Sequence, residues 1–287
     1  MRKIALASTM CLVTAAAAGF AMRRSQLHSV FEAESGLAVS GAVTTTIILG
    51  YCALIFACAL TFSIMLSRRV KPGEGYRRMF RGADASAAVV SLMCFGVMCW
   101  CAFSLWRQSG ALLRPGNMIK EELSRGRLLR GMSVLCFLSG IAFTVVEFAA
   151  GARRADGLAK LFAFMPELFC TVWLIELYRA NQTNPELLTF GFSAAAIVCA
   201  AMSFYYTAGA VFSKNHPGRA AFFHICGVFL CAVALADFSS LTESLLYGAI
   251  LARLLVNFMR LTAQSHVPES VNTAPGTEAI ESSPKDY

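Results

Sequence analysis

The sequence predicts an all-α fold, a polytopic transmembrane helical bundle of about eight spans that ends in a disordered C-terminal tail. Of the 287 residues, 57% are hydrophobic and only 15% are charged, and the mean hydropathy is +0.60. A soluble domain of this size cannot bury that much apolar surface. The arginines and lysines also lie in short stretches between long uncharged runs, which indicates that lipid surrounds most of the chain.

The first hydrophobic run covers residues 4–22 and follows Arg2 and Lys3. A signal peptide is one interpretation, because the small residues Ala15 to Ala18 offer a cleavage site. The run is longer than the core of a signal peptide, which has about 7 to 15 apolar residues. We therefore expect a retained helix.

Seven further runs complete a predicted transmembrane domain over residues 1–261. About 20 helical residues cross the ~30 Å hydrocarbon core, and each run is continuous, without the alternation of barrel strands. Lipid offers no partner for backbone polar groups, so each run should be a helix. The remaining spans are predicted near residues 43–66, 85–106, 131–151, 161–178, 187–212, 220–237 and 241–261.

The chain changes composition after the last run. Residues 262–287 are rich in Ser, Thr, Pro and Glu and poor in apolar side chains. Such a composition cannot offset the entropy of ordering the chain. We predict a disordered polar tail.

The distribution of basic residues predicts the orientation. Fourteen arginines and lysines lie on the side of the N-terminus and nine on the other side. Because positively charged loops stay in the cytoplasm, we expect a multi-pass protein of the cell membrane with both termini cytoplasmic.

The segment from Arg107 to Arg130 is the exception, since this orientation makes it a basic external loop. Asn117 could cap a short helix whose apolar face contains Ile119 and Leu123. An amphipathic helix on the lipid headgroups and a solvated loop are both consistent with the pattern.

All 11 cysteines fall inside the apolar runs, and Cys99 and Cys101 form no C-x-x-C pair and have no His or Asp at ligand spacing. We therefore expect free thiols and neither a disulfide framework nor a metal site or other cofactor. The net charge of +8 indicates contact with anionic lipid headgroups of the bilayer and not with nucleic acid.

Several charged residues lie within the runs, although each intramembrane charge costs about 2.5 to 3.5 kcal/mol even on a lenient scale. Alternating topology brings one group of polar residues to a single layer below the N-terminal face. This layer is the predicted ligand site or polar cavity, and it contains Glu147, Glu167, Tyr205, Tyr206, His224, Arg253 and Asn257. The alternative is that these groups pair with one another and only fix helix packing. Glu176, Asp237 and Glu243 lie near the opposite ends, where solvation or helix capping explains them.

The similar depth of these residues in the membrane also predicts an ion pair within the layer. A guanidinium cannot shed its proton, so Arg253 needs a counter-charge, and Glu147, Glu167 or both could supply it.

Two classes of function remain. Transport or sensing of a small polar molecule fits the charged layer, and a non-catalytic membrane partner or accessory subunit is the alternative. No catalytic signature has workable geometry: Ser193 and His224, for example, fall on opposite sides of the membrane. The sequence thus favours a non-catalytic role without deciding against an enzyme, and it identifies no protein partner.

Overall fold

The computed structural model describes residues 2–29, 43–69, 85–113, 120–151, 157–182, 187–212, 214, 216–237 and 240–264. Eight segments within these ranges are helical, long enough and apolar enough to cross a membrane, which confirms the predicted transmembrane bundle. The helices are α1 (Arg2–Ser29), α2 (Val43–Arg69), α4 (Ala85–Leu112), α5 (Lys120–Gly151), α6 (Gly157–Ala163), α7 (Met165–Asn181), α8 (Leu187–Val211), α9 (Pro217–Leu235) and α10 (Leu241–Gln264).

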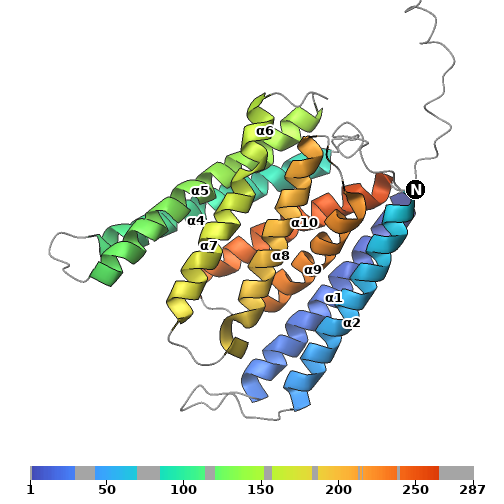
Figure 1. Cartoon of the computed structure of the whole chain (residues 1–287), viewed down its shortest axis with the longest axis horizontal. Coiled ribbons are helices and arrows are strands. Elements are labelled where there is room, and N and C mark those ends of the chain that lie inside the picture. Colours follow the sequence, from blue (N-terminus) through green and yellow to red (C-terminus); the bar gives the residue numbers. More distant parts are fainter. Residues whose placement is uncertain are drawn as a thin grey trace, which may run out of the picture.

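The most enclosed helix is α9, which packs against α1, α2, α8 and α10. Figure 1 shows α1 and α2 side by side on one flank, α4 and α5 paired on the opposite flank, and α7 to α10 between them. We call the end of the bundle where α1 begins the N-terminal face. Because the spans alternate in direction, α5, α8 and α10 end at this face, and α4 and α9 begin there.

Several helices extend beyond the spans that hydropathy predicts, and two of the extensions change the interpretation of charged residues. Helix α1 continues to Ser29, so Arg23 and Arg24 belong to it and not to a loop. Helix α5 begins at Lys120 and runs without interruption to Gly151. From Lys120 to Arg130 the basic segment is therefore part of α5, and it is neither a separate surface helix nor a loop. Its proposed cap, Asn117, lies outside the described residues, as does most of the predicted tail.

The fifth span consists of α6 and α7, which meet at Phe164. Pro166 lies in the first turn of α7, where the amide hydrogen that proline lacks has no helical partner. The break therefore falls just before the proline. It places Glu167 in the first turn of α7.

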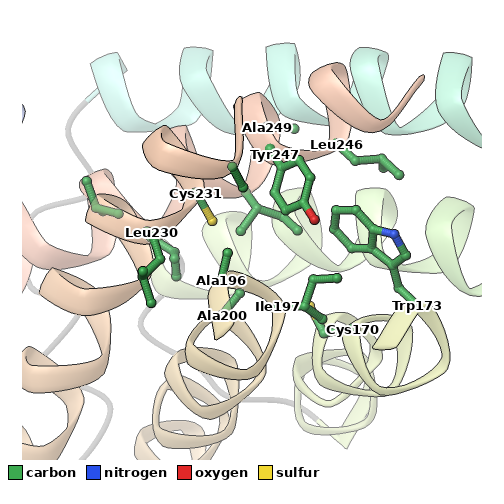
Figure 2. Close-up of a cluster of buried hydrophobic side chains, with 14 of the residues drawn as sticks. Cys170, Trp173, Ala196, Ile197, Ala200, Leu230, Cys231, Leu246, Tyr247 and Ala249 are labelled. Carbon is green, nitrogen blue, oxygen red and sulfur yellow. The ribbon is translucent and has the colours of Figure 1, made fainter. Parts of the chain in front are cut away.

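The middle of the bundle is apolar. Figure 2 shows part of this cluster, where side chains of α7, α8, α9 and α10 interdigitate. Trp173 of α7 and Tyr247 of α10 lie with ring centroids 4.7 Å apart, and both are almost fully buried. The cluster separates the polar groups near the N-terminal face from those near the opposite face.

Helix α9 approaches α2 most closely at Gly218. The Ser63 hydroxyl donates a hydrogen bond of 2.8 Å to the Gly218 carbonyl, and a Cβ atom at Gly218 would lie 2.6 Å from the backbone oxygen of Ser63. We expect Gly218→Ala to destabilise the detergent-solubilised protein by about 1 to 3 kcal/mol, because the two helices must separate.

Gly248→Ala is the matched control, since nothing lies within 4 Å of a Cβ atom there. Alanine should be neutral or stabilising at that position by about 0.5 to 1 kcal/mol through helix propensity. Melting temperatures of the two variants in one detergent would test the contact. Equal shifts for both variants would contradict it.

All 11 cysteines carry free thiols. Most are buried among apolar side chains, while Cys11 and Cys58 are exposed on the outside of their helices.

Candidate functional site

A buried ionic cluster joins α4, α5 and α10 near the N-terminal face. Arg253 of α10 donates to Glu147 of α5 over 3.1 Å, and both side chains are only 3% exposed. Arg260 donates to the same carboxylate, to Oε2 over 2.9 Å and also to Oε1. Ser91 of α4 lies 2.5 Å from Arg253 Nη1 and 3.4 Å from Glu147 Oε2. The predicted pairing of Arg253 with Glu147 is confirmed.

The spacing of residues on α10 positions the basic side of the cluster. Arg253, Asn257 and Arg260 are separated by four and three residues, so they lie on one face of the helix. That face is directed inward, since Arg253 and Asn257 are each 2% exposed. The Arg253 guanidinium also lies over the Phe143 ring, 5.5 Å from its centroid. Such a contact adds a modest attraction at a desolvated site.

A small cavity adjoins this face of α10. Its volume is about 20 Å³, which exceeds the roughly 10 to 15 Å³ that one water molecule requires. Most of the wall is apolar, and Arg253, Asn257 and Thr207 supply the polar groups. The complete lining consists of Ala142, Phe143, Val146, Ala163, Pro166, Phe204, Thr207, Val211, Arg253 and Asn257.

Asn257 is the least satisfied polar residue of the cavity. Neither its Oδ1 nor its Nδ2 atom has a hydrogen-bond partner among the described residues, although both are buried. An unpaired buried amide is expensive, at about 1 to 3 kcal/mol for each lost partner. The cavity beside it is a place where a small polar molecule can supply those bonds.

Two further buried polar side chains, those of His224 and Ser203, lie near the depth of Asn257 in the bundle. The His224 ring places Nδ1 at hydrogen-bond distance from the Ala220 carbonyl, and its Nε2 atom has no partner in the described part of the chain. A carbonyl only accepts, so in neutral His224 the proton is on Nδ1 and Nε2 is an acceptor. The Ser203 hydroxyl is likewise buried and unpaired.

The packing of α9 against α10 places His224 and Asn257 at about the same depth along the bundle. A Cβ atom at Gly227 would lie 2.7 Å from Leu254 Cδ1 and 3.6 Å from Ser203 Oγ, so these three residues meet. His224 precedes Gly227 by three residues, and Asn257 follows Leu254 by three in an antiparallel helix. We call Ser203, Thr207, His224, Arg253 and Asn257 the polar layer.

The structure does not bring every predicted residue into this layer. Glu167 is partly exposed in the first turn of α7, and among the described residues its neighbour Pro166 lines the cavity while Glu167 does not. Of the two glutamates predicted as possible partners of Arg253, Glu147 is the one that forms the ion pair. Tyr205 is 48% exposed on the outer side of α8. Tyr206 stacks on Phe223, with ring centroids 5.6 Å apart, away from the cavity.

A second buried ion pair lies near the opposite face, and hydropathy alone did not indicate it. Arg23 of α1 is fully buried and donates over 2.8 Å to Asp237, which follows α9. It also donates to Gln26 over 2.8 Å, and its guanidinium lies 4.8 Å from the centroid of the Phe192 ring. Asp237 is therefore a buried ion-pair partner, whereas the sequence analysis explains it by solvation or helix capping.

Glu176 is also paired, with Arg125 at 2.9 Å. The Arg125 side chain is 51% exposed, so this pair is close to solvent or headgroups. Within the described ranges no three His, Cys, Asp or Glu side chains form a group that could hold a metal ion. Near the N-terminal face, the guanidinium and amide groups can donate hydrogen bonds to a bound molecule.

Comparisons of the chain with protein-family models, with characterised proteins and with solved structures find no match.

Proposed function

We propose that this multi-pass membrane protein takes up a small polar molecule in the polar layer, as a transporter or a sensor. The observation that carries the proposal is the unpaired side chain of Asn257, which borders the same cavity as Arg253. Buried polar atoms are nearly always hydrogen-bonded in proteins, so an exception at a cavity points to a missing ligand or water.

The apolar cluster between the two faces supports this function. A polar solute that enters from the N-terminal face meets the polar layer first and then the Trp173–Tyr247 contact. The buried Arg23–Asp237 pair supplies polar groups near the opposite face. Polar groups on both sides of an apolar barrier suit a path that opens to one side at a time. On the orientation that the basic residues favour, the polar layer lies nearer the cytoplasm of the cell.

An accessory role in a membrane complex is the second candidate. The cavity holds about 20 Å³, far less than the roughly 300 to 1,000 Å³ of ordinary ligand pockets. Glu147 and Arg253 are in closed contact, as expected if they only fix helix packing. Helix α2 also buries only 22% of its span against the rest of the chain, which leaves a broad face for lipid or a partner helix.

Replacing Asn257 with leucine distinguishes the two functions. If the amide is kept for a ligand, the variant should be more stable than the native protein by about 1 to 3 kcal/mol, because it removes an unpaired buried group at similar volume. The melting temperature of the purified full-length chain in detergent would measure this change.

Asn181→Leu is the matched control. The Asn181 amide donates to the Leu177 carbonyl over 2.9 Å, so its replacement removes a bond and should not stabilise the protein. A lower melting temperature for Asn257→Leu would show that the amide has a structural partner, and the ligand site would then be rejected.

A further inference from the structure

We propose that the molecule taken up by the polar layer carries a carboxylate group, and that the Glu147 side chain occupies the place of that group in the closed protein. The inference rests on the function proposed above and names the class of ligand. It starts from the geometry of the donors around Glu147.

The donors around Glu147 form a cradle for a planar anion with two oxygens. Oε2 accepts from both Arg253 and Arg260, and Oε1 accepts from Arg260. The Ser91 hydroxyl lies beside the group, 3.4 Å from Oε2, and is also 2.9 Å from the Ala87 carbonyl. Guanidinium groups bind carboxylates through parallel hydrogen bonds, with a preference that a single point charge does not provide.

The cradle is continuous with the cavity, because Arg253 belongs to both. A molecule whose carboxylate binds Arg253 would extend along α10 toward Asn257, one turn away on the same face. The Nδ2 donor and the Oδ1 acceptor of Asn257 have no partner among the described residues, so a second polar group on the molecule would be recognised there. The arrangement thus selects a small carboxylate with a further hydrogen-bonding group.

Glu147 must leave the cradle before such a molecule binds, since the present cavity has room for about one water molecule. The residue lies in the last turns of α5, which ends at Gly151 near the N-terminal face. Its side chain can therefore turn toward that face without crossing the apolar cluster. The exchange keeps the charge balance of Arg253 constant, because one carboxylate replaces another.

Chemical rescue of Glu147→Ala tests the exchange. The full-length variant is reconstituted in nanodiscs of zwitterionic lipid, and its melting temperature is measured in sodium acetate or sodium chloride, each at about 100 mM. Acetate should raise the melting temperature by roughly 3 °C or more relative to chloride, in a saturable manner. The native protein should shift less, because Glu147 already fills the cradle.

Two variants are controls for the rescue. Glu176→Ala removes the carboxylate of the exposed pair with Arg125 and should not respond to acetate. Glu147→Ala combined with Arg253→Leu and Arg260→Leu removes both guanidinium groups of the cradle as well as the anion and should also be insensitive. Equal effects of acetate and chloride, or a response in either control, would overturn the proposal.

Three further measurements distinguish other sources of the anion and other reasons for the absence of a rescue by acetate. A shift with inorganic phosphate but not acetate, or in anionic-lipid nanodiscs without acetate, would replace the carboxylate ligand by a phosphate or a headgroup. If Glu147→Ala cannot be purified in chloride, recovery in acetate buffer supports the proposal. Loss in both buffers, while the triple variant that also lacks Arg253 and Arg260 is recovered, overturns it. The outcome for Asn257→Leu is independent of these measurements, so failure of the carboxylate assignment and failure of the ligand site are distinguishable.

Discussion

Replacing Glu147 with leucine is expected to destabilise the solubilised protein by about 3 to 5 kcal/mol. Arg253 is 2% exposed, and Glu147 is its ion-pair partner among the described residues. The guanidinium cannot release its proton, so the substitution leaves a buried charge without compensation. Unfolding can be followed with a thiol-reactive fluorophore, because the buried cysteines become accessible as the bundle opens.

The partner substitutions should rank in a defined order. Arg253→Leu should cost less than Glu147→Leu, since Arg260 still neutralises the carboxylate. The double variant should recover part of the loss, because leucines replace the pair at similar volume. Glu176→Leu, at the exposed pair with Arg125, should cost only about 0 to 1 kcal/mol. Additive effects of the two single substitutions would show that Glu147 and Arg253 do not interact.

Arg23→Leu is expected to cause the second large loss, about 3 kcal/mol or more at pH 8 and less at pH 5. Burial raises the pKa of Asp237, while the Arg23 guanidinium and the Ser193 hydroxyl hold it down in part. Without Arg23 the pKa of Asp237 rises further, and the folded state holds the proton more tightly than the unfolded state. Stability then falls as the pH rises from the ordinary pKa of 3.8 through the raised value.

Two comparisons isolate the pair of Arg23 and Asp237. Adding Asp237→Asn to Arg23→Leu should restore part of the stability and remove the extra dependence on pH. Arg24→Leu alters the next residue of α1, whose side chain is exposed, and should cost under about 1 kcal/mol. The melting temperatures at both pH values would measure these effects. A loss in Arg23→Leu that does not change between pH 5 and pH 8 would contradict the assignment of Asp237 as its partner.

The membrane fold was predictable because hydropathy reports directly on the solvent around each segment. The depth of a residue along its helix was equally accessible, which is why Glu147 and Arg253 could be matched although they are 106 residues apart. The rotation of each helix about its axis was not accessible. Tyr205 and Tyr206 share the depth of the layer, but packing of α8 against α7 and α9 turns them away from the cavity.

Arg23 and Arg260 were missed for a different reason. A hydropathy profile ends a span where charged residues begin, so Arg23 was assigned to the region after the first span. Arg260 lies one residue before the end of the last predicted span, and its charge was counted with the loops. The helices continue past them because backbone hydrogen bonds do not depend on the side chain. The spacing of Arg253, Asn257 and Arg260 on one helical face was the available signal for Arg260. For Arg23 the partner Asp237 is 214 residues away, and only tertiary packing identifies it.

The central claim, that the polar layer holds a small polar molecule, is tested most directly by an experimental structure of the full chain in a lipid nanodisc. We expect density for a bound molecule larger than water in the polar layer, within hydrogen-bond distance of Oδ1 or Nδ2 of Asn257 and next to Arg253. A cavity that is empty or holds only water, or an Asn257 amide bonded to protein atoms or turned toward lipid, would contradict the claim.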